Sequence, residues 1–544
     1  MLSSRDDKHC RLRAPRRWVL ALTSLACAAL LGVRLGPHAR HGGAEEGVRG
    51  ARSKERAAAS GTSRRSRGIR PSKASKGRPN ILLIVADDHA AGTLGVEGDS
   101  RAVTPSLDAL AKSGVRFTRA FCNSPLCTPS RQSFITGRLP HAVGVTKLQT
   151  PLPASAVTLG DRLGRAGYRT ASIGKMHFNG PSHHGFELRL DTAEWESYLG
   201  ENPPPGGDLR RPWRPFREHP RLWLNADCRD CGLPASHMES TYYVDRALEF
   251  ARREDDRPFL LVVGMYEPHA PFRFPREWNG RLRSDQFEVP PLEGSDRDAQ
   301  PKVFRKLSET DFLNIQRAYF TSLSFLDEQV GRLVRGLDAS GVGANTIVVY
   351  LGDNGYMLGK HGRFEKHCMY DAATRVPLLI RAPGASGSGR ALDDLVELVD
   401  LAPTLLDLAG VETPSDLHGR SLAPLLRGEP GAHGRDVVVS EYLEDEVAMA
   451  RDARWKLIVG TGKKHEHYYD AEQERGEPFV RLFDLESDPR ETTDLSDRPD
   501  LEPVRVRLLA ALRDRFLSTR GRLPAVPANL DALAAVRYCL APPD

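Results

Sequence analysis

Short, uninterrupted runs of apolar residues recur along the chain, and several of them are rich in β-branched side chains. Residues 80–86, 259–264 and 346–351 are the clearest of these runs. A strand that is buried on both faces has this pattern, because neither face meets water. The runs therefore predict the inner strands of a parallel sheet.

Segments with a helical spacing of apolar residues follow these runs. They cover residues 104–113, 157–166, 310–337 and 395–409. The alternation of buried strands and helices predicts a doubly wound α/β fold, with a mostly parallel sheet flanked by helices. Ligands bind such sheets beyond the carboxyl ends of the strands. Residues 186–235 predict an irregular insertion, which either walls a substrate pocket or forms a surface loop without such a role.

The pattern changes near residue 428. Three shorter strand-like runs then precede a helical stretch at 501–517. These runs are residues 437–441, 455–459 and 481–485. We therefore predict a main catalytic domain over residues 79–428 and a smaller C-terminal α+β subdomain with an antiparallel sheet over residues 429–544.

The N-terminal segment has the composition of a targeting sequence. A cluster of arginines precedes the apolar run 18–33, which is short for a membrane-spanning helix. Residues 1–35 predict a signal peptide, with an uncleaved signal anchor as the alternative, and a secreted or periplasmic protein. Residues 36–78 are basic and poor in large apolar side chains, so they predict a disordered linker. Membrane contact is expected only through such an anchor.

The formal net charge of +6 comes from this N-terminal segment. Residues 1–79 have 19 Lys and Arg against 5 Asp and Glu, whereas the remainder has 58 against 66. The body of the protein is therefore mildly acidic, and nucleic acid is not an expected partner.

The sequence contains eight cysteines, and their spacing does not indicate a disulfide framework. Cys228 and Cys231 have the spacing of half a zinc site, but no second pair of this spacing exists. A local disulfide and two free thiols are the alternatives for this pair.

Cys127 lies in a turn between the apolar run 115–121 and a helix that starts near Pro129. Proline fits the first turn of a helix, where its missing N–H costs nothing. The free N–H groups of that turn favour an anion, and Arg131 adds a guanidinium. The stretch therefore predicts a nucleophile beside an anion site.

Polar residues follow two of the predicted inner strands. Asp87 and Asp88 come directly after one strand, and Asp353 and Asn354 come after another. Adjacent carboxylates at the end of a buried strand are costly unless a positive group meets them. An isolated Asp-Asn-Gly sequence, by contrast, is a common turn.

Two long motifs carry a family resemblance. Cys-Thr-Pro-Ser-Arg at 127–131, with Phe-Ile-Thr-Gly at 134–137, matches one sulfatase signature, and residues 167–177 match the second. From about residue 79 to about residue 516, the chain therefore resembles the type I sulfatases of the alkaline phosphatase superfamily.

The resemblance implies that a maturation enzyme converts Cys127 to Cα-formylglycine. A thiol would form a stable sulfate adduct. A hydrated aldehyde instead offers one hydroxyl to attack sulfur and a second whose collapse expels sulfate. The implied enzyme would thus be a sulfuric ester hydrolase with covalent catalysis.

The resemblance also assigns a metal site to Asp87, Asp88, Asp353 and Asn354, together with the modified Cys127. Oxygen ligands suit a hard cation, which is Ca²⁺ or Mg²⁺. The cation would hold a sulfate oxygen and a nucleophile hydroxyl.

The remaining implied catalytic residues are cationic or can exchange protons. Arg131, Lys175 and Lys366 would stabilise the sulfuryl group during its transfer. His177 would act beside the formylglycine, and His269 beside the ester oxygen.

The substrate stays open at this stage. Residues 174–187 resemble choline sulfatases, whereas the region around Lys366 resembles iduronate sulfatases. Sulfated sugars or small sulfate esters are the expected substrates. A phosphonate monoester hydrolase or phosphodiesterase of the same superfamily is one alternative, and an inactive, anchored carbohydrate-binding protein is the other.

A chain that begins at Arg78 should unfold as cooperatively, and at the same midpoint temperature, as the full chain. The residues before it have too little apolar content to join a core. Scanning calorimetry of both chains tests this, and a large drop in the midpoint of the shorter chain would show that the N-terminal segment packs on the body.

Overall fold

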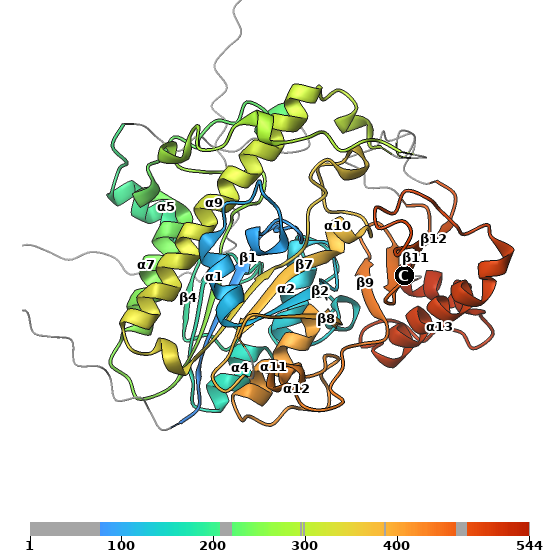
Figure 1. Cartoon of the computed structure of the whole chain (residues 1–544). Helices are drawn as coiled ribbons and strands as arrows, with labels where there is room; N and C mark the ends of the chain where they lie inside the picture. Colours follow the sequence, from blue (N-terminus) through green and yellow to red (C-terminus); the bar gives the residue numbers. More distant parts are fainter. Residues whose placement is uncertain are drawn as a thin grey trace, which may run out of the picture. The chain divides into compact units, whose positions relative to one another are not determined.

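A computed structural model describes most of the chain beyond its N-terminal segment (Figure 1). The described residues are 77–206, 220–293, 296, 300–385, 388–463 and 476–542. The predictions for residues 1–35 and 36–78 lie outside these ranges, apart from Gly77 and Arg78. None of the described helices combines the length and the apolar composition that a membrane crossing requires.

An eight-stranded sheet forms the centre of the fold, in the order β4-β3-β5-β1-β6-β7-β2-β8. The strands are β1 (Asn80–Ala86), β2 (Val115–Phe121), β3 (Arg169–Gly174), β4 (Leu188–Leu190), β5 (Phe259–Gly264), β6 (Thr346–Gly352), β7 (Arg375–Arg381) and β8 (Arg390–Glu397). Strand β1 pairs in parallel with β5 and β6, whereas β7 is antiparallel to both β6 and β2. The mostly parallel sheet confirms the predicted fold class.

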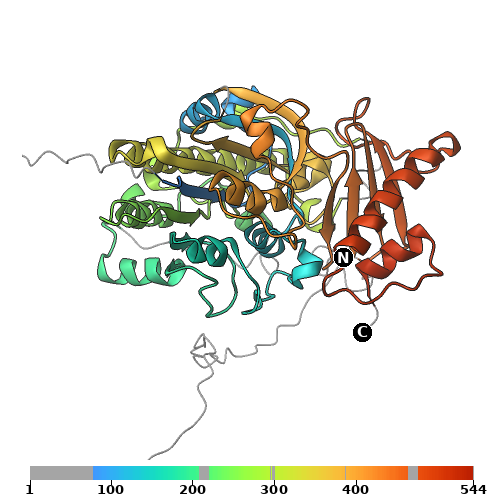
Figure 2. The same ribbon diagram turned by 90° about the horizontal axis from the view of Figure 1, so that it is seen from below.

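Helices cover both faces of this sheet (Figures 1 and 2). One face packs against α1 (Pro105–Ser113), α7 (Glu239–Ala251) and α9 (Glu309–Ala339). The other face packs against α2 (Cys127–Thr136), α4 (Leu159–Arg165), α11 (Leu401–Leu408) and α12 (Ala423–Arg427). Shorter helices are α3 (Pro140–Val143), α5 (Thr192–Glu201), α6 (Pro220–Trp223) and α10 (Asp371–Thr374).

Strand β1 shows why its sequence is continuously apolar. Leu82 and Ile84 belong to the cluster under α7 and α9, whereas Ile81, Leu83 and Val85 belong to the cluster under α2 and α4. Since successive side chains of a strand point to opposite faces, both faces require apolar residues.

Two local predictions were wrong. The helix predicted over 395–409 begins only at Leu401, because the residues up to Glu397 form β8, an edge strand whose first half is partly exposed. Its alternation of polar and apolar residues does not resemble the inner strands. The insertion predicted as irregular over 186–235 contains β4, α5 and α6.

The C-terminal region forms a separate antiparallel sheet in the order β12-β11-β10-β9. Its strands are β9 (Val438–Tyr442), β10 (Val447–Arg451), β11 (Trp455–Gly460) and β12 (Phe479–Asp484). One face packs against α13 (Glu502–Ser518) and α14 (Ala532–Leu540), and the other packs against residues of the main sheet region (Figure 2). The pattern predicted three of these strands and α13, but missed β10 and α14.

A buried lysine links this sheet to the main one. Lys456 of β11 is fully buried, and its ammonium group pairs with Glu491 at 2.6 Å and with Asp371 of α10. It also donates a hydrogen bond to the carbonyl of Met369 at 3.1 Å. These contacts compensate the desolvation of all three charges.

We predict that Lys456→Met lowers the free energy of unfolding by about 3–5 kcal/mol, because it leaves the buried carboxylate of Glu491 without its cation. Urea unfolding would measure the loss. The exposed Lys112 at the end of α1 gives the control, since Lys112→Gln should change stability by less than about 0.5 kcal/mol. Equal stability of the two variants would contradict the role given to Lys456.

Candidate active site

Two neighbouring parallel strands bring four oxygen-bearing side chains to one edge of the sheet. Asp87 and Asp88 follow β1, and Asp353 and Asn354 follow β6, its parallel partner. All four are buried. The backbone N–H of Asp88 donates to Asp353 Oδ1 at 3.1 Å, and Asn354 Nδ2 donates to Asp88 Oδ1 at 2.7 Å. The sequence-predicted metal ligands therefore converge.

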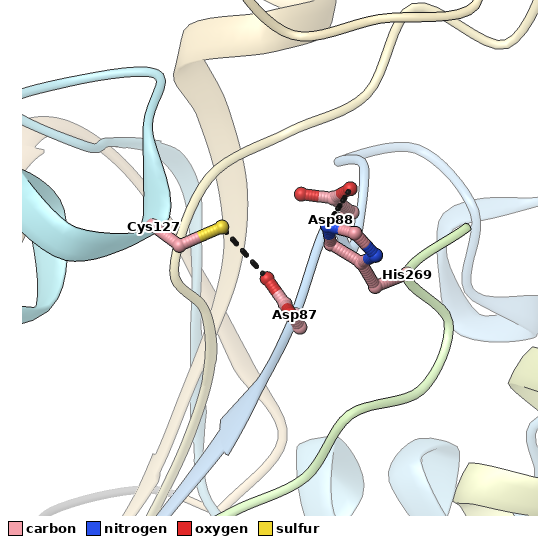
Figure 3. Close-up of side chains that lie close together, drawn as sticks. All are labelled: Asp87, Asp88, Cys127 and His269. Carbon is pink, nitrogen blue, oxygen red and sulfur yellow. Dashed lines mark hydrogen bonds and ion pairs between the residues drawn. The ribbon is translucent and has the colours of Figure 1, made fainter. Parts of the chain in front are cut away.

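Cys127 begins α2, and its side chain points toward Asp87 (Figure 3). Its thiol donates to Asp87 Oδ1 at 3.1 Å, and Lys366 Nζ lies 2.8 Å from its sulfur. Burial, and then the charge of Asp87, raise the pKa of the Cys127 thiol above its usual range. The unmodified side chain is therefore a protonated thiol.

Two lysines face the carboxylates of β1. Lys175 pairs with Asp87, and Lys366 pairs with Asp88. Burial is the largest single effect and lowers the pKa of Lys175, but the acidic groups around it, with Asp87 first among them, together raise that pKa to about 12. Burial also lowers the pKa of Lys366, but the acidic groups around it, with Asp88 first among them, raise that pKa well above its usual value. Both lysines are therefore charged.

Arg131 supplies a fully buried guanidinium from the second turn of α2. Its Nε donates to Asp353 Oδ2 at 2.7 Å, and its Nη1 donates to the carbonyl of Lys175. Its Nη2 lies 3.7 Å from Asp87 Oδ1 and makes no hydrogen bond to the described residues. The guanidinium thus keeps one donor free at the centre of the site.

His177 has a defined hydrogen-bond pattern. Its Nδ1 lies 3.1 Å from Thr128 Oγ1, whose own proton goes to the carbonyl of Leu148 at 2.7 Å. His177 Nδ1 must therefore donate, which leaves Nε2 as an acceptor. Burial and then Lys175 lower the pKa of His177 well below its usual value, so the ring is neutral.

His269 follows β5 and lies opposite Cys127 across the two aspartates (Figure 3). Its Nδ1 donates to the carbonyl of Ala270 at 2.6 Å, so the neutral ring presents the lone pair of Nε2. That atom lies 3.7 Å from Asp88 Oδ2. Burial lowers the pKa of His269 to about 4, although Asp88 acts in the opposite sense.

The donor set fits a divalent cation. Ligand atoms of Asp87, Asp88, Cys127 and His269 all lie within 4.8 Å of one another. Asn354 Oδ1 is buried nearby and has no hydrogen-bond partner among the described residues. Carboxylate and amide oxygens dominate this group, as Ca²⁺ and Mg²⁺ require.

Two glycines fix the position of the Lys175 backbone. Gly174 has a positive φ of 86°, and Gly264, at the end of β5, accepts the N–H of Lys175 at 2.9 Å. A Cβ on Gly264 would lie 2.0 Å from the carbonyl oxygen of Lys175. Both positions therefore exclude larger residues, because the two strand ends touch there.

A cavity of about 320 Å³ lies beside Lys175 and His177. Its outer wall includes Arg189, Asp191 and Thr192, which belong to the insertion expected to wall a substrate pocket. This cavity is the natural place for the part of a substrate that carries no reacting group.

The structure adds supporting residues that the sequence did not single out. Gln132 donates to the carbonyls of Met176 and His177, both at 2.8 Å, and so ties α2 to the residues after β3. Tyr319 of α9 donates to the carbonyl of Asp88 at 2.9 Å. Gln132 lies inside the motif stretch, which was a usable signal. Tyr319 lies far along the chain and carried none.

Comparisons with known proteins agree with this geometry. A sulfatase family model matches residues 79–411, and a model described as N-sulphoglucosamine sulphohydrolase, C-terminal, matches residues 359–516. A choline-sulfatase of Rhizobium meliloti is 32% identical over 470 residues, which cover 80% of this chain and 86% of the relative. Human iduronate 2-sulfatase is 29% identical over 395 residues, which cover 62% and 70%.

Solved structures show the same fold. A phosphonate monoester hydrolase of Agrobacterium radiobacter superposes with a TM-score of 0.66 at 23% identity, covering 82% of this chain and 96% of that one. A protein in complex with its substrate D-glucosamine-2-N,6-O-disulfate superposes with a TM-score of 0.65 at 24% identity, covering 82% and 99%. The chain therefore belongs to the sulfatase family, a class of sulfuric ester hydrolases with an alkaline phosphatase-like fold.

We predict that Asp87→Ala or Asp353→Ala lowers turnover by at least about 100-fold, the scale for losing one electrostatic stabiliser. Each change removes a carboxylate without removing apolar core, so far-UV circular dichroism should be unchanged. Exhaustive dialysis against a strong chelator should have the same effect.

Metal analysis provides the control for this prediction. The wild-type protein should contain one equivalent of Ca²⁺ or Mg²⁺, and each variant should contain less. Full activity of a wild-type sample shown to be free of metal would refute the assignment of a metal site.

Proposed function

We propose that this protein hydrolyses sulfate monoesters, with a formylglycine made from Cys127 as its nucleophile and a divalent cation beside it. The observation that carries this proposal is the position of Cys127. Its sulfur lies at the start of a buried helix, between Asp87 Oδ1 at 3.1 Å and Lys366 Nζ at 2.8 Å. A nucleophile here has a carboxylate, an ammonium group and a helix N-terminus in reach.

Three cations would bind the sulfate group. Arg131 has an Nη2 atom that donates no hydrogen bond to the described residues. The ammonium group of Lys175 pairs with Asp87, and that of Lys366 pairs with Asp88. Their positive charges face the place where the sulfuryl oxygens gain negative charge during transfer. Because they are buried and held in place, they need no reorganisation when that charge develops.

The two histidines would move protons. His177 presents an unprotonated Nε2, which suits it to accept a proton from the nucleophile side. His269 also presents an unprotonated Nε2, on the other side of the aspartates, so it would first take up a proton there and then pass it to the leaving oxygen. The cavity beside Lys175 would hold the alcohol part of the ester.

Two groups complete the proposed site. A cation held by Asp87, Asp88, Asp353 and Asn354 would supply Lewis-acid polarisation of the sulfate group. The aldehyde hydrate made from Cys127 would supply a second hydroxyl for release of the product. A maturation enzyme is the implied partner, and a secreted or periplasmic location suits an enzyme that acts on external sulfate esters.

Active preparations should carry an aldehyde at position 127. Mass spectrometry of the peptide from Phe121 to Arg131 should show sulfur replaced by oxygen together with the loss of two hydrogens, which distinguishes an aldehyde from serine, and should show the matching hydrate. Cys127→Ala should remove turnover of 4-nitrophenyl sulfate, because no nucleophile remains. Cys127→Ser should stall as a stable sulfate ester, because serine lacks the second hydroxyl.

Two results would oppose the proposal. One is full-rate sulfate ester hydrolysis by a preparation whose residue 127 is entirely thiol. The other is a much faster turnover of an aryl phosphate diester or a phosphonate monoester than of 4-nitrophenyl sulfate, which would favour the phosphoryl alternative.

A further inference from the structure

Lys175 has a long and flexible side chain whose ammonium group must hold one position in the site. Its backbone N–H donates to the carbonyl of Gly264 at 2.9 Å, and its ammonium group pairs with Asp87. The side chain is 9% exposed and borders the cavity beside it. A carboxylate attracts an ammonium group from many directions, so this ion pair alone leaves several side-chain conformations open. A second contact, which limits the direction of approach, would fix the ammonium group.

The aromatic ring of Tyr266 supplies such a contact. Tyr266 follows β5 by two residues and lines the same cavity as Lys175. Lys175 Nζ lies over the face of the ring, 4.6 Å from its centre. The electron density of an aromatic face attracts a cation, and the attraction is stronger where water is excluded. The ammonium group therefore contacts both a carboxylate and a ring face.

The ring of Tyr266 is itself held in place by a charged network that reaches α7. The guanidinium of Arg273 also lies over this ring, 4.9 Å from its centre. Arg273 Nη1 lies 3.6 Å from Oε2 of Glu239, a buried residue of α7. Glu239 in turn accepts hydrogen bonds from Tyr243 at 2.6 Å and from Thr192 at 2.9 Å. These contacts restrict the ring that faces Lys175.

The hydroxyl group of Tyr266 takes no part in this arrangement. Within the part of the chain that the structure describes, it forms no hydrogen bond. Burial raises the pKa of Tyr266, although Lys175 and Arg273 act in the opposite sense, so the ring carries no charge of its own at neutral pH. The contact with Lys175 therefore depends on the ring face, which phenylalanine would preserve.

We propose that Tyr266 is a positioning residue for Lys175, and that its ring face directs the ammonium group to the place where the sulfuryl oxygens gain charge. The proposal rests on the sulfatase function proposed above and adds a residue that acts through Lys175. Because Lys175 would stabilise the transition state more than the bound ester, an ammonium group that is less well placed should lower kcat and leave KM nearly unchanged.

Replacement of the ring tests this proposal. Tyr266→Leu and Tyr266→Met both substitute an aliphatic chain, so a folding defect in one of them leaves the other for the test. Each should lower kcat for 4-nitrophenyl sulfate on the order of tenfold, the scale of a cation–π contact shielded from water, and change KM by less than about twofold. Tyr266→Phe should keep the wild-type kcat, because it keeps the ring face.

The chemical reactivity of Lys175 gives a readout that needs no turnover. Limited acetylation with acetic anhydride, followed by mass spectrometry of the peptide that contains Lys175, measures how readily its ammonium group leaves Asp87. The acetylation rate should rise at least about threefold in Tyr266→Leu and Tyr266→Met, and stay unchanged in Tyr266→Phe. The exposed Lys112 should react equally in every variant, so it serves as the internal reference.

Tyr242→Leu is the matched control. Tyr242 of α7 is also partly buried, and the guanidinium of Arg246 lies over its ring, 5.4 Å from the centre. It does not line the cavity beside Lys175. The same substitution at this position should leave both kcat and the acetylation of Lys175 unchanged.

The proposal is overturned if Tyr266→Phe loses as much activity as Tyr266→Leu, since the hydroxyl group would then be the part that acts. It is also overturned if the loss lies in KM alone, if the acetylation of Lys175 is the same in Tyr266→Leu as in the wild type, or if Tyr242→Leu has equal effects. If the wild-type protein does not hydrolyse 4-nitrophenyl sulfate, the proposed function fails, and the acetylation rates then decide whether Tyr266 positions Lys175.

Discussion

The structure depends on compensated charge at the buried edge of one sheet. Asp87, Asp88 and Asp353 lie where β1 and β6 end, almost without solvent, and such carboxylates would destabilise the fold if left alone. Lys175, Lys366 and Arg131 meet them directly. These cations come from three separate connections, so the charges of the site and the packing of the helices around it stabilise each other. Removing one of these charged side chains leaves its partner buried and unpaired, which lowers the stability of the fold even where the secondary structure is unchanged.

The sequence predicted the inner strands, because burial on both faces demands apolar residues along the whole strand. This requirement is visible in the strand's own sequence. The family resemblance, and not the hydrophobic pattern, predicted that Asp87 and Asp353 would share a metal site. The structure explains why they meet, because β1 and β6 are neighbouring parallel strands that end at the same edge. The prediction failed for an edge strand, whose hydrophobic pattern depends on its position in the sheet. Edge strand β8 tolerates charged residues at 390, 393 and 394, so its sequence did not resemble an inner strand, and its last residues, 395–397, were taken for the start of a helix.

Contacts between distant segments were beyond sequence analysis. Nothing local in Lys456 shows that it is buried between two acids, and nothing local in Tyr319 shows that it supports Asp88. The motifs identified the chemistry of the active site, but the arrangement of the cations around it could be seen only in the folded structure.

The burial of α2 also limits when Cys127 could be modified relative to the folding of the chain. All ten residues from Cys127 to Thr136 are buried in the folded protein, and Cys127 itself is 1% exposed. The finished fold therefore offers no part of this segment to an enzyme that would oxidise Cys127. The maturation proposed above would have to act on the nascent or unfolded polypeptide, before α2 docks. Folding speed would then set the fraction of the protein that is activated, because a chain that folded first would keep its thiol.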